Sequence, residues 1–184
     1  TRAIIEYMDR EKRVDYILLM DDVVVIEPSA IFRTWSFLGG LRREYRDRFL
    51  SGAMLMLSKP CVQFENSAYW VRIKLCSKGR GMDMRDARML VRNETELNRP
   101  NQYGAWWFCC IPSKRVEEIG YPLPVFIKGD DIEFGLRNDR PLITMNGIAV
   151  WHQDFDAKQS PVQSYFAERN SGDFRWQDQQ YICF

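Results

Sequence analysis

The sequence predicts one domain of mixed α/β fold, and three observations support this prediction. Apolar, β-prone runs alternate with segments whose apolar residues recur at helical spacing. Polar side chains follow several of these runs: a carboxylate pair after 16–20, a second pair after 125–128, and an imidazole soon after 142–150. The 184 residues can bury one sizeable core but leave little room for a second domain.

The first third of the chain is expected to alternate helix and strand. Apolar residues of 1–8 share one helical face, and the charged stretch 9–13 ends that helix. Pro28-Ser29 is typical of a helix start, and apolar residues continue at helical spacing to Leu41. In order, we expect a helix near the start, strands at 15–20 and 23–26, a helix at 28–41, and strands at 49–57 and 62–71.

Residues 74–102 are polar and contain few apolar anchors. Loops of this length inside a compact domain are usually functional lids or disordered segments, and both alternatives stay open here. Regular structure is expected to resume afterwards. The predicted elements are a strand at 105–111, a helix at 113–120, a strand at 125–128, a helix at 132–138, a strand at 142–150 and a helix at 161–170.

The charge balance gives no argument for a nucleic-acid partner, because 26 Lys and Arg nearly match 25 Asp and Glu. No apolar run approaches the roughly 18 to 20 residues that span a bilayer, and the N-terminus does not resemble a signal peptide. We therefore expect a cytoplasmic protein. The chain lacks an initiator Met and begins in what reads as a helix under way, so we expect an excerpt of a longer protein.

A first candidate site is a divalent metal centre. Asp21 and Asp22 follow a strand, and such hard oxygen ligands favour Mg²⁺ or Mn²⁺. His152, the single histidine, could add a ligand that Mn²⁺ accepts. Two alternatives stay open: acidic pairs after strands are often helix caps or solvated turns, and a lone histidine is often a structural, hydrogen-bonded residue.

A second candidate site combines a base with an aromatic platform. Asp130 and Asp131 could take a proton from a hydroxyl, since a neighbouring like charge or an apolar wall raises a carboxyl pKa. Trp106 and Trp107 could form that wall and bind the C–H face of a sugar, or they could belong to the core and its rim. With a metal-held diphosphate, these parts describe sugar transfer from a nucleotide donor to a hydroxyl.

Four motifs in this order resemble those of family 2 glycosyltransferases of the GT-A fold, most closely the galactofuranosyltransferases that build bacterial galactan. The motifs are Leu-Met-Asp-Asp at 19–22 with Ile-Glu-Pro at 26–28, Tyr-Gly-Ala-Trp-Trp-Phe at 103–108, Pro-Leu-Pro-Val-Phe-Ile-Lys-Gly-Asp-Asp at 122–131, and Val-Trp-His at 150–152. The resemblance covers residues 1 to about 170. It implies a GT-A-like mixed sheet flanked by helices, N-terminally truncated because the nucleotide-binding units of that fold lie upstream of the acidic motif.

The resemblance also implies roles for individual residues. The general base would be Asp131. The residues that contact the substrates would be Asp130, Trp106, Trp107 and Asp22. Asp21 and His152 would be the ligands of Mn²⁺ or Mg²⁺. In the family, the third place of the acidic motif supplies a carboxylate, and here it is Val23, which cannot ligate. Arg169 and Asn170 would contact the donor phosphate or serve structurally.

The activity implied by the resemblance is inverting, metal-dependent transfer of a sugar, expected to be galactofuranose from UDP-galactofuranose. The acceptor would be a hydroxyl of a growing cell-surface polysaccharide, as a glycan or lipid-linked glycan, with 74–102 as an acceptor-side loop. Regions outside this chain would provide peripheral association with the inner face of the cell membrane. The alternatives are a dTDP-rhamnose donor and a non-catalytic carbohydrate-binding remnant.

Overall fold

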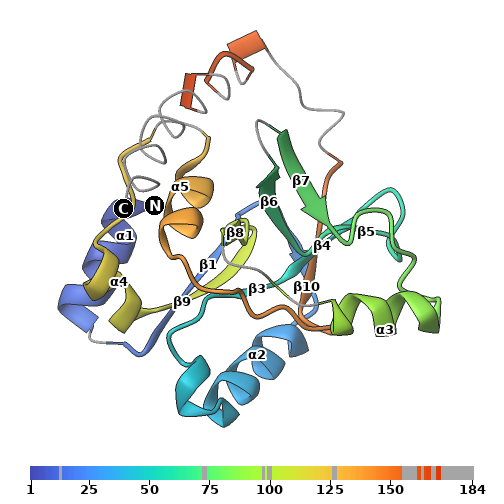
Figure 1. The fold of residues 1–184 in the computed structure, drawn as a ribbon, viewed down its shortest axis with the longest axis horizontal. Coiled ribbons are helices and arrows are strands. Elements are labelled where there is room, and N and C mark those ends of the chain that lie inside the picture. Colours follow the sequence, from blue (N-terminus) through green and yellow to red (C-terminus); the bar gives the residue numbers. More distant parts are fainter. Residues whose placement is uncertain are drawn as a thin grey trace.

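Three small sheets form the centre of the computed structural model, and helices surround them (Figure 1). The structure describes residues 1–12, 14–71, 74–96, 98, 101–125, 128–154, 161–162, 164–166 and 169–170. None of the helices among these residues combines the length and the apolar composition that a membrane crossing requires.

The sheets contain antiparallel pairs and one parallel pair. The first has the order β1 (Tyr16–Met20), β9 (Phe108–Pro112) and β3 (Leu50–Ser51) and is antiparallel throughout. The second has the order β2 (Val25–Ile26), β10 (Ala149–His152), β4 (Ala53–Met56) and β5 (Gln63–Glu65), with β10 and β4 parallel. The third has the order β7 (Lys74–Lys78), β6 (Ser67–Val71) and β8 (Gln102–Tyr103).

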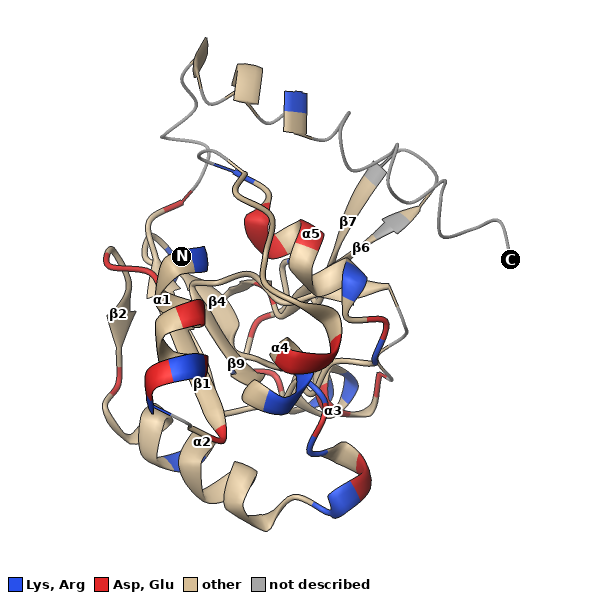
Figure 2. Cartoon of the chain, turned by 90° about the vertical axis from the view of Figure 1, so that its left-hand side faces the viewer, with Lys and Arg blue, Asp and Glu red and all other residues tan. Residues whose placement is uncertain are grey.

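The helices lie around these sheets. They are α1 (Arg2–Tyr7), the π-helical segment η1 (Met8–Lys12), α2 (Ser29–Gly40), the 3-10 turn η2 (Arg43–Tyr45), α3 (Ala87–Thr95), α4 (Ser113–Ile119) and α5 (Asp130–Arg137). In Figure 2, residues of both charge signs are mixed along α1 and α4, and acidic residues gather at the start of α5.

The alternating side chains of β1 and β9 divide the core into two layers. Ile17 of β1 and Ile111 of β9 face a cluster that α1, α4 and α5 complete with Ile5, Val116 and Phe134. On the opposite face, Phe108 and Cys110 of β9 join a cluster that contains Leu38 of α2, Met54 of β4 and Val150 of β10. Helices therefore cover both faces of this central sheet, which confirms the predicted α/β class.

Most predicted elements are present, but three predictions need correction, and the strands predicted at 49–57 and 62–71 are each divided in two. Residues 74–102 are not one long loop, since they contain β7, α3 and the start of β8. Polar residues hold this segment in place where apolar anchors were expected, since Lys78 and Asn93 are buried. The Asp86 side chain caps α3 by accepting a hydrogen bond from the Arg88 backbone N–H.

The other two corrections concern expected strands. Val125 and Lys128, at the ends of the strand expected at 125–128, are not in a strand, and 126–127 lie outside the described residues. The strand expected at 142–150 begins only at Ala149, because a turn with Gly147 at φ +85° precedes it. In addition, the run 62–71 forms two strands, β5 and β6, that separate at Asn66.

Candidate active site

Asp21 and His152 lie close together although the sequence places them at opposite ends of the described chain. Asp21 follows β1, and His152 ends β10. The Asp21 Oδ2 and His152 Nε2 atoms are 3.8 Å apart. The imidazole is 4% exposed and the carboxylate 45% exposed, so this pair has one rigid, buried member and one that solvent and ligands can reach.

The second nitrogen of His152 fixes the tautomer of the ring. Nδ1 lies 2.6 Å from the backbone carbonyl oxygen of Gln153. Because a carbonyl only accepts, Nδ1 carries the proton in this contact. In the uncharged form of this tautomer the lone pair is on Nε2, the atom nearer Asp21, as in a metal-binding histidine whose other nitrogen donates to a carbonyl.

The donor set at this point fits a divalent cation in part. Mg²⁺ binds its ligands at about 2.0 to 2.1 Å, so two ligand atoms 3.8 Å apart can share one ion of that kind. Asp22 is exposed in the adjoining turn, and Val23 is 48% exposed there without a ligand atom. Within the described ranges, no group of three or more acidic, His or Cys side chains could hold a metal ion. Water or a substrate would have to complete the shell.

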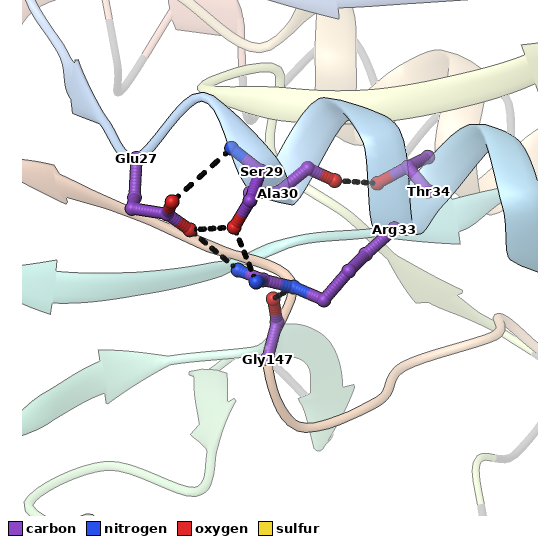
Figure 3. A network of polar contacts seen from close by, with 6 residues as sticks. All are labelled: Glu27, Ser29, Ala30, Arg33, Thr34 and Gly147. Carbon is purple, nitrogen blue, oxygen red and sulfur yellow. Dashed lines mark hydrogen bonds and ion pairs between the residues drawn. The ribbon is translucent and has the colours of Figure 1, made fainter.

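A polar network ties together the two segments that carry these residues. Glu27 follows β2, and its Oε2 lies 2.9 Å from Nη2 of Arg33 in α2 (Figure 3). The Nε of Arg33 donates to the carbonyl oxygen of Gly147, 2.7 Å away, in the turn before β10. Since β2 also pairs with β10, the turn after Asp21 and the strand of His152 are fixed to each other. The ion pair itself is exposed to solvent, so it contributes little to stability.

Asp131 lies in the first turn of α5, next to Asp130. The helix starts after Gly129, whose φ of +98° turns the chain sharply into it. The Ile132 N–H donates to Asp131 Oδ1 at 2.8 Å. Burial first, and then the charge of Asp130, raise the pKa of Asp131 to about 7, although the hydrogen bond from Ile132 opposes this shift. Asp131 thus exchanges a proton near neutral pH.

Glu65 on β5 belongs to the same electrostatic environment, and the sequence analysis missed it. Glu65 is 4% exposed, and this burial raises the pKa of its carboxyl group to about 7. A hydrogen bond from the Ser77 hydroxyl and the charge of Arg80 oppose this shift. The Glu65 charge in turn raises the pKa of Asp131. The sequence did contain a signal of burial at this position, because Glu65 alternates with Gln63 and so lies on the same side of the strand.

The helix that carries Asp131 packs closely on β8. A Cβ atom at Gly135 would collide with Tyr103, so the absence of a side chain at Gly135 permits this approach. Burial, together with the charges of Asp131 and Glu65, raises the Tyr103 pKa well above its ordinary value. Asp131, Glu65 and Tyr103, from α5, β5 and β8, are therefore electrostatically coupled.

The two tryptophans occupy different environments. Trp107 is 8% exposed in the core, and its indole N–H donates to the carbonyl oxygen of Gly52 at 3.0 Å. Trp106 is half-buried and packs edge-on against Phe134, with ring centroids 6.3 Å apart. Of the expected platform, Trp106 retains accessible surface, whereas Trp107 follows the alternative interpretation of a core residue.

Asn170, whose role was left open between donor and structural contact, reaches the segment before Asp130. Its side-chain amide donates to the carbonyl oxygen of Lys128. The residue is buried. This contact supports the backbone two residues before Asp130, which is a structural role.

Comparison with known proteins gives two similar sequences. The chain is 30% identical over 172 residues to the galactofuranosyltransferase GlfT2 of Mycobacterium tuberculosis and 31% identical over 175 residues to that of Mycolicibacterium smegmatis. These alignments cover 84% and 85% of this chain but 26% of each relative, so the chain spans about a quarter of their length. The chain is a partial homologue of these two proteins. No family model matches it.

Proposed function

We propose that this chain is the catalytic portion of an inverting, metal-dependent glycosyltransferase of family 2 with a GT-A fold. Its donor would be UDP-galactofuranose and its acceptor a hydroxyl of a growing cell-surface polysaccharide. Similarity to the two galactofuranosyltransferases supports the class and the sugar. The observation that carries the chemistry is the Asp131 pKa of about 7, because a general base must exchange its proton near the working pH.

In this proposal Asp131 takes the proton of the acceptor hydroxyl. The oxygen freed of its proton attacks the anomeric carbon of the donor sugar and forms the new glycosidic bond. The bond between that carbon and the diphosphate breaks at the same time, and the nucleoside diphosphate leaves with its electron pair. Attack opposite the leaving group inverts the anomeric configuration.

The neighbours of Asp131 tune and orient this step. Asp130 and Glu65 keep the proton affinity of Asp131 high through their charges. Asp130 would also bind substrate hydroxyls, and Trp106 would offer a ring face to the acceptor sugar. The buried wall around Asp131 strengthens hydrogen bonds between its carboxylate and the acceptor by keeping water away.

Asp21 and the Nε2 atom of His152 would hold Mn²⁺ or Mg²⁺, with Asp22 contacting the donor. A bound cation would neutralise charge on the departing diphosphate. The hydrogen bond from His152 Nδ1 to the Gln153 carbonyl would orient the ring and leave Nε2 as the ligand atom. Because Val23 supplies no carboxylate, we expect the cation to bind together with the donor rather than ahead of it.

A second candidate function is carbohydrate binding without catalysis. It is favoured by Val23 in place of a carboxylate and by the incomplete ligand set among the described residues. Such a protein would bind acceptor glycan through Trp106 and Asp130 but would release no nucleoside diphosphate.

The decisive experiment is a transfer assay with the protein that carries this chain. UDP-galactofuranose and dTDP-rhamnose are offered as donors with Mn²⁺, and release of nucleoside diphosphate and glycan extension are followed together. Wild type is compared with Asp131→Asn and with Asp139→Asn, an exposed control at φ +47° that asparagine tolerates. Transfer that Asp131→Asn abolishes and Asp139→Asn leaves intact supports the proposal. Acceptor binding without transfer would establish the second candidate, and preference for dTDP-rhamnose would change the donor.

A further inference from the structure

A cluster of buried carboxamides links α3 to the strand that carries Glu65. The Asn93 side chain of α3 uses both of its polar groups. Its Oδ1 accepts from Gln63 Nε2 at 3.0 Å and from Asn66 Nδ2 at 2.8 Å. Its Nδ2 donates to Gln63 Oε1 at 3.2 Å and to Asn146 Oδ1 at 2.8 Å. Both acceptor positions and both donor hydrogens of this amide are occupied.

This cluster is buried and geometrically demanding. Gln63, Asn66 and Asn93 are all buried, so each polar atom that lost its partner would stay away from water. The Gln63 amide also donates to the carbonyl oxygen of Gly79 at 3.0 Å, and a Cβ atom at Gly79 would collide with that amide. The chain therefore accommodates the cluster with a glycine at φ +70°.

The ladder of this strand is short and irregular. β5 has three residues and pairs with β4 through a register irregularity between Met54 and Leu55. On its other side, the Gln63 backbone exchanges hydrogen bonds with Gly81 and Met82, so the carboxamides act together with these contacts. Glu65 lies between Gln63 and Asn66, the two strand-side partners of Asn93. A cavity of about 210 Å³ borders Gln63 and Asn93, so water has a route to this strand if the carboxamide contacts are lost.

We infer that Asn93 is a positioning residue, which holds β5 through Gln63 and Asn66 and so keeps the Glu65 carboxyl buried within electrostatic reach of Asp131. The inference rests on the proposed function, since it gives Glu65 the task of tuning the base. It assigns the segment 87–95, expected from the sequence to be part of a loop, a place in the architecture of the site.

The Glu65 carboxyl experiences charged and polar groups from several elements. Ser77 of β7 donates to it, and Arg80 follows β7. Asp131 of α5 and Tyr103 of β8 are electrostatically coupled to it. Burial exceeds the opposing effects of Ser77 and Arg80, so the Glu65 pKa reports how well β5 is held.

The test is a ¹³C NMR titration of the Glu65 side-chain carboxyl, assigned with Glu65→Gln, in wild type, Asn93→Ala and Asn146→Ala. Asn146 contacts Asn93 and the Leu90 carbonyl but not β5, so its loss loosens α3 alone. We expect Asn93→Ala to lower the Glu65 pKa by about one unit or more, towards its ordinary value of about 4.3, and Asn146→Ala to leave it in place. If Asn93→Ala does not fold, Asn66→Ala provides the same test. Of the hydrogen bonds made by Asn93, it removes only the one from Asn66, so a smaller decrease of the Glu65 pKa is expected.

An unchanged Glu65 pKa in the folded Asn93 or Asn66 variant would overturn the inference, and so would an equal shift in Asn146→Ala. The titration needs neither donor nor acceptor, so it reports on positioning even if the protein transfers no sugar. In a transferring protein, Asn93→Ala should shift the midpoint of the pH profile, because it changes the charge that Glu65 presents to Asp131. A loss of rate at constant profile shape would indicate general scaffolding and contradict the positioning role.

Discussion

Two regions of the molecule present carboxylates for chemistry, and they differ in how complete they are. Around Asp131, the chain itself provides burial, the neighbouring charge of Asp130 and the second carboxyl of Glu65, so the shifted pKa needs no ligand. Around Asp21, the chain provides an oriented histidine and an exposed carboxylate, and the third place is Val23. The fold itself therefore builds the environment of the proposed base, whereas the proposed cation site would depend on what the substrate adds.

The largest effect should come from removing the carboxylate of the complete region. We expect Asp131→Asn to lower kcat by about 10² to 10⁴-fold, the usual contribution of a general base. Steady-state transfer at saturating donor measures it. An Asp131→Asn enzyme with wild-type kcat would remove the distinction between the regions, because the shifted carboxyl would then do no chemistry.

The incomplete region should respond to substitutions that change its ligands. We expect Val23→Asp to tighten Mn²⁺ binding by about tenfold or more, since affinity for hard cations rises with the number of charged ligands. His152→Ala should weaken Mn²⁺ binding in the presence of donor. Isothermal titration with Mn²⁺, with and without nucleoside diphosphate, measures both. Equal Mn²⁺ affinity in wild type and Val23→Asp would show that position 23 is not part of the site.

The charges around Asp131 should set the pH dependence of the reaction. The base works ionised, so kcat/KM is expected to rise through pH about 7 and to level off above it. Asp130→Asn removes the larger of the two neighbouring charges that raise this pKa, and Glu65→Gln removes the smaller. Both should therefore move the rising limb to lower pH, Asp130→Asn further. A shift to higher pH in either variant is the opposite of what these charges impose.

The smallest expected effect is on stability. Glu65 has a folded pKa of about 7, above its unfolded value, so its contribution to stability is highest below that unfolded value and declines as pH rises towards 7. Glu65→Gln should flatten this decline and raise Tm at pH 8, relative to wild type, by a few degrees at most, roughly 2 to 4 °C per kcal/mol. Thermal unfolding at pH 5 and pH 8 compares the two proteins, and a Tm loss at pH 8 alone would contradict the sign.

The sequence predicted what local pattern and the chemistry of motifs determine. Residues 16–20 form a strand, 29–40 and 130–137 form helices, and the polar residues at the ends of β1 and β10 come together as Asp21 and His152. Periodicity and capping residues suffice for such elements. Asp21 follows a strand of one sheet and His152 ends a strand of another, so their pairing was expected from metal-ligand chemistry and from the family resemblance rather than from strand order.

The remaining features depend on partners that are distant in the sequence. Asn93 looks like a loop residue until its partners Gln63, Asn66 and Asn146 are placed around it. Glu65 carries no motif, and its shifted pKa results from burial under several elements. Trp106 and Trp107 lie in a turn, and their rings contact different clusters: Trp107 belongs to the cluster of Met54, and Trp106 packs on that of Phe134.

The central claim is that the fold holds Asp131 as a base with a pKa near neutrality. A ¹³C NMR titration of its side-chain carboxyl in the wild-type protein, assigned with Asp131→Asn, tests this claim without substrate. We expect a midpoint near pH 7, coupled to the titration of Glu65. A midpoint near 4, the ordinary value of an aspartate, would contradict it.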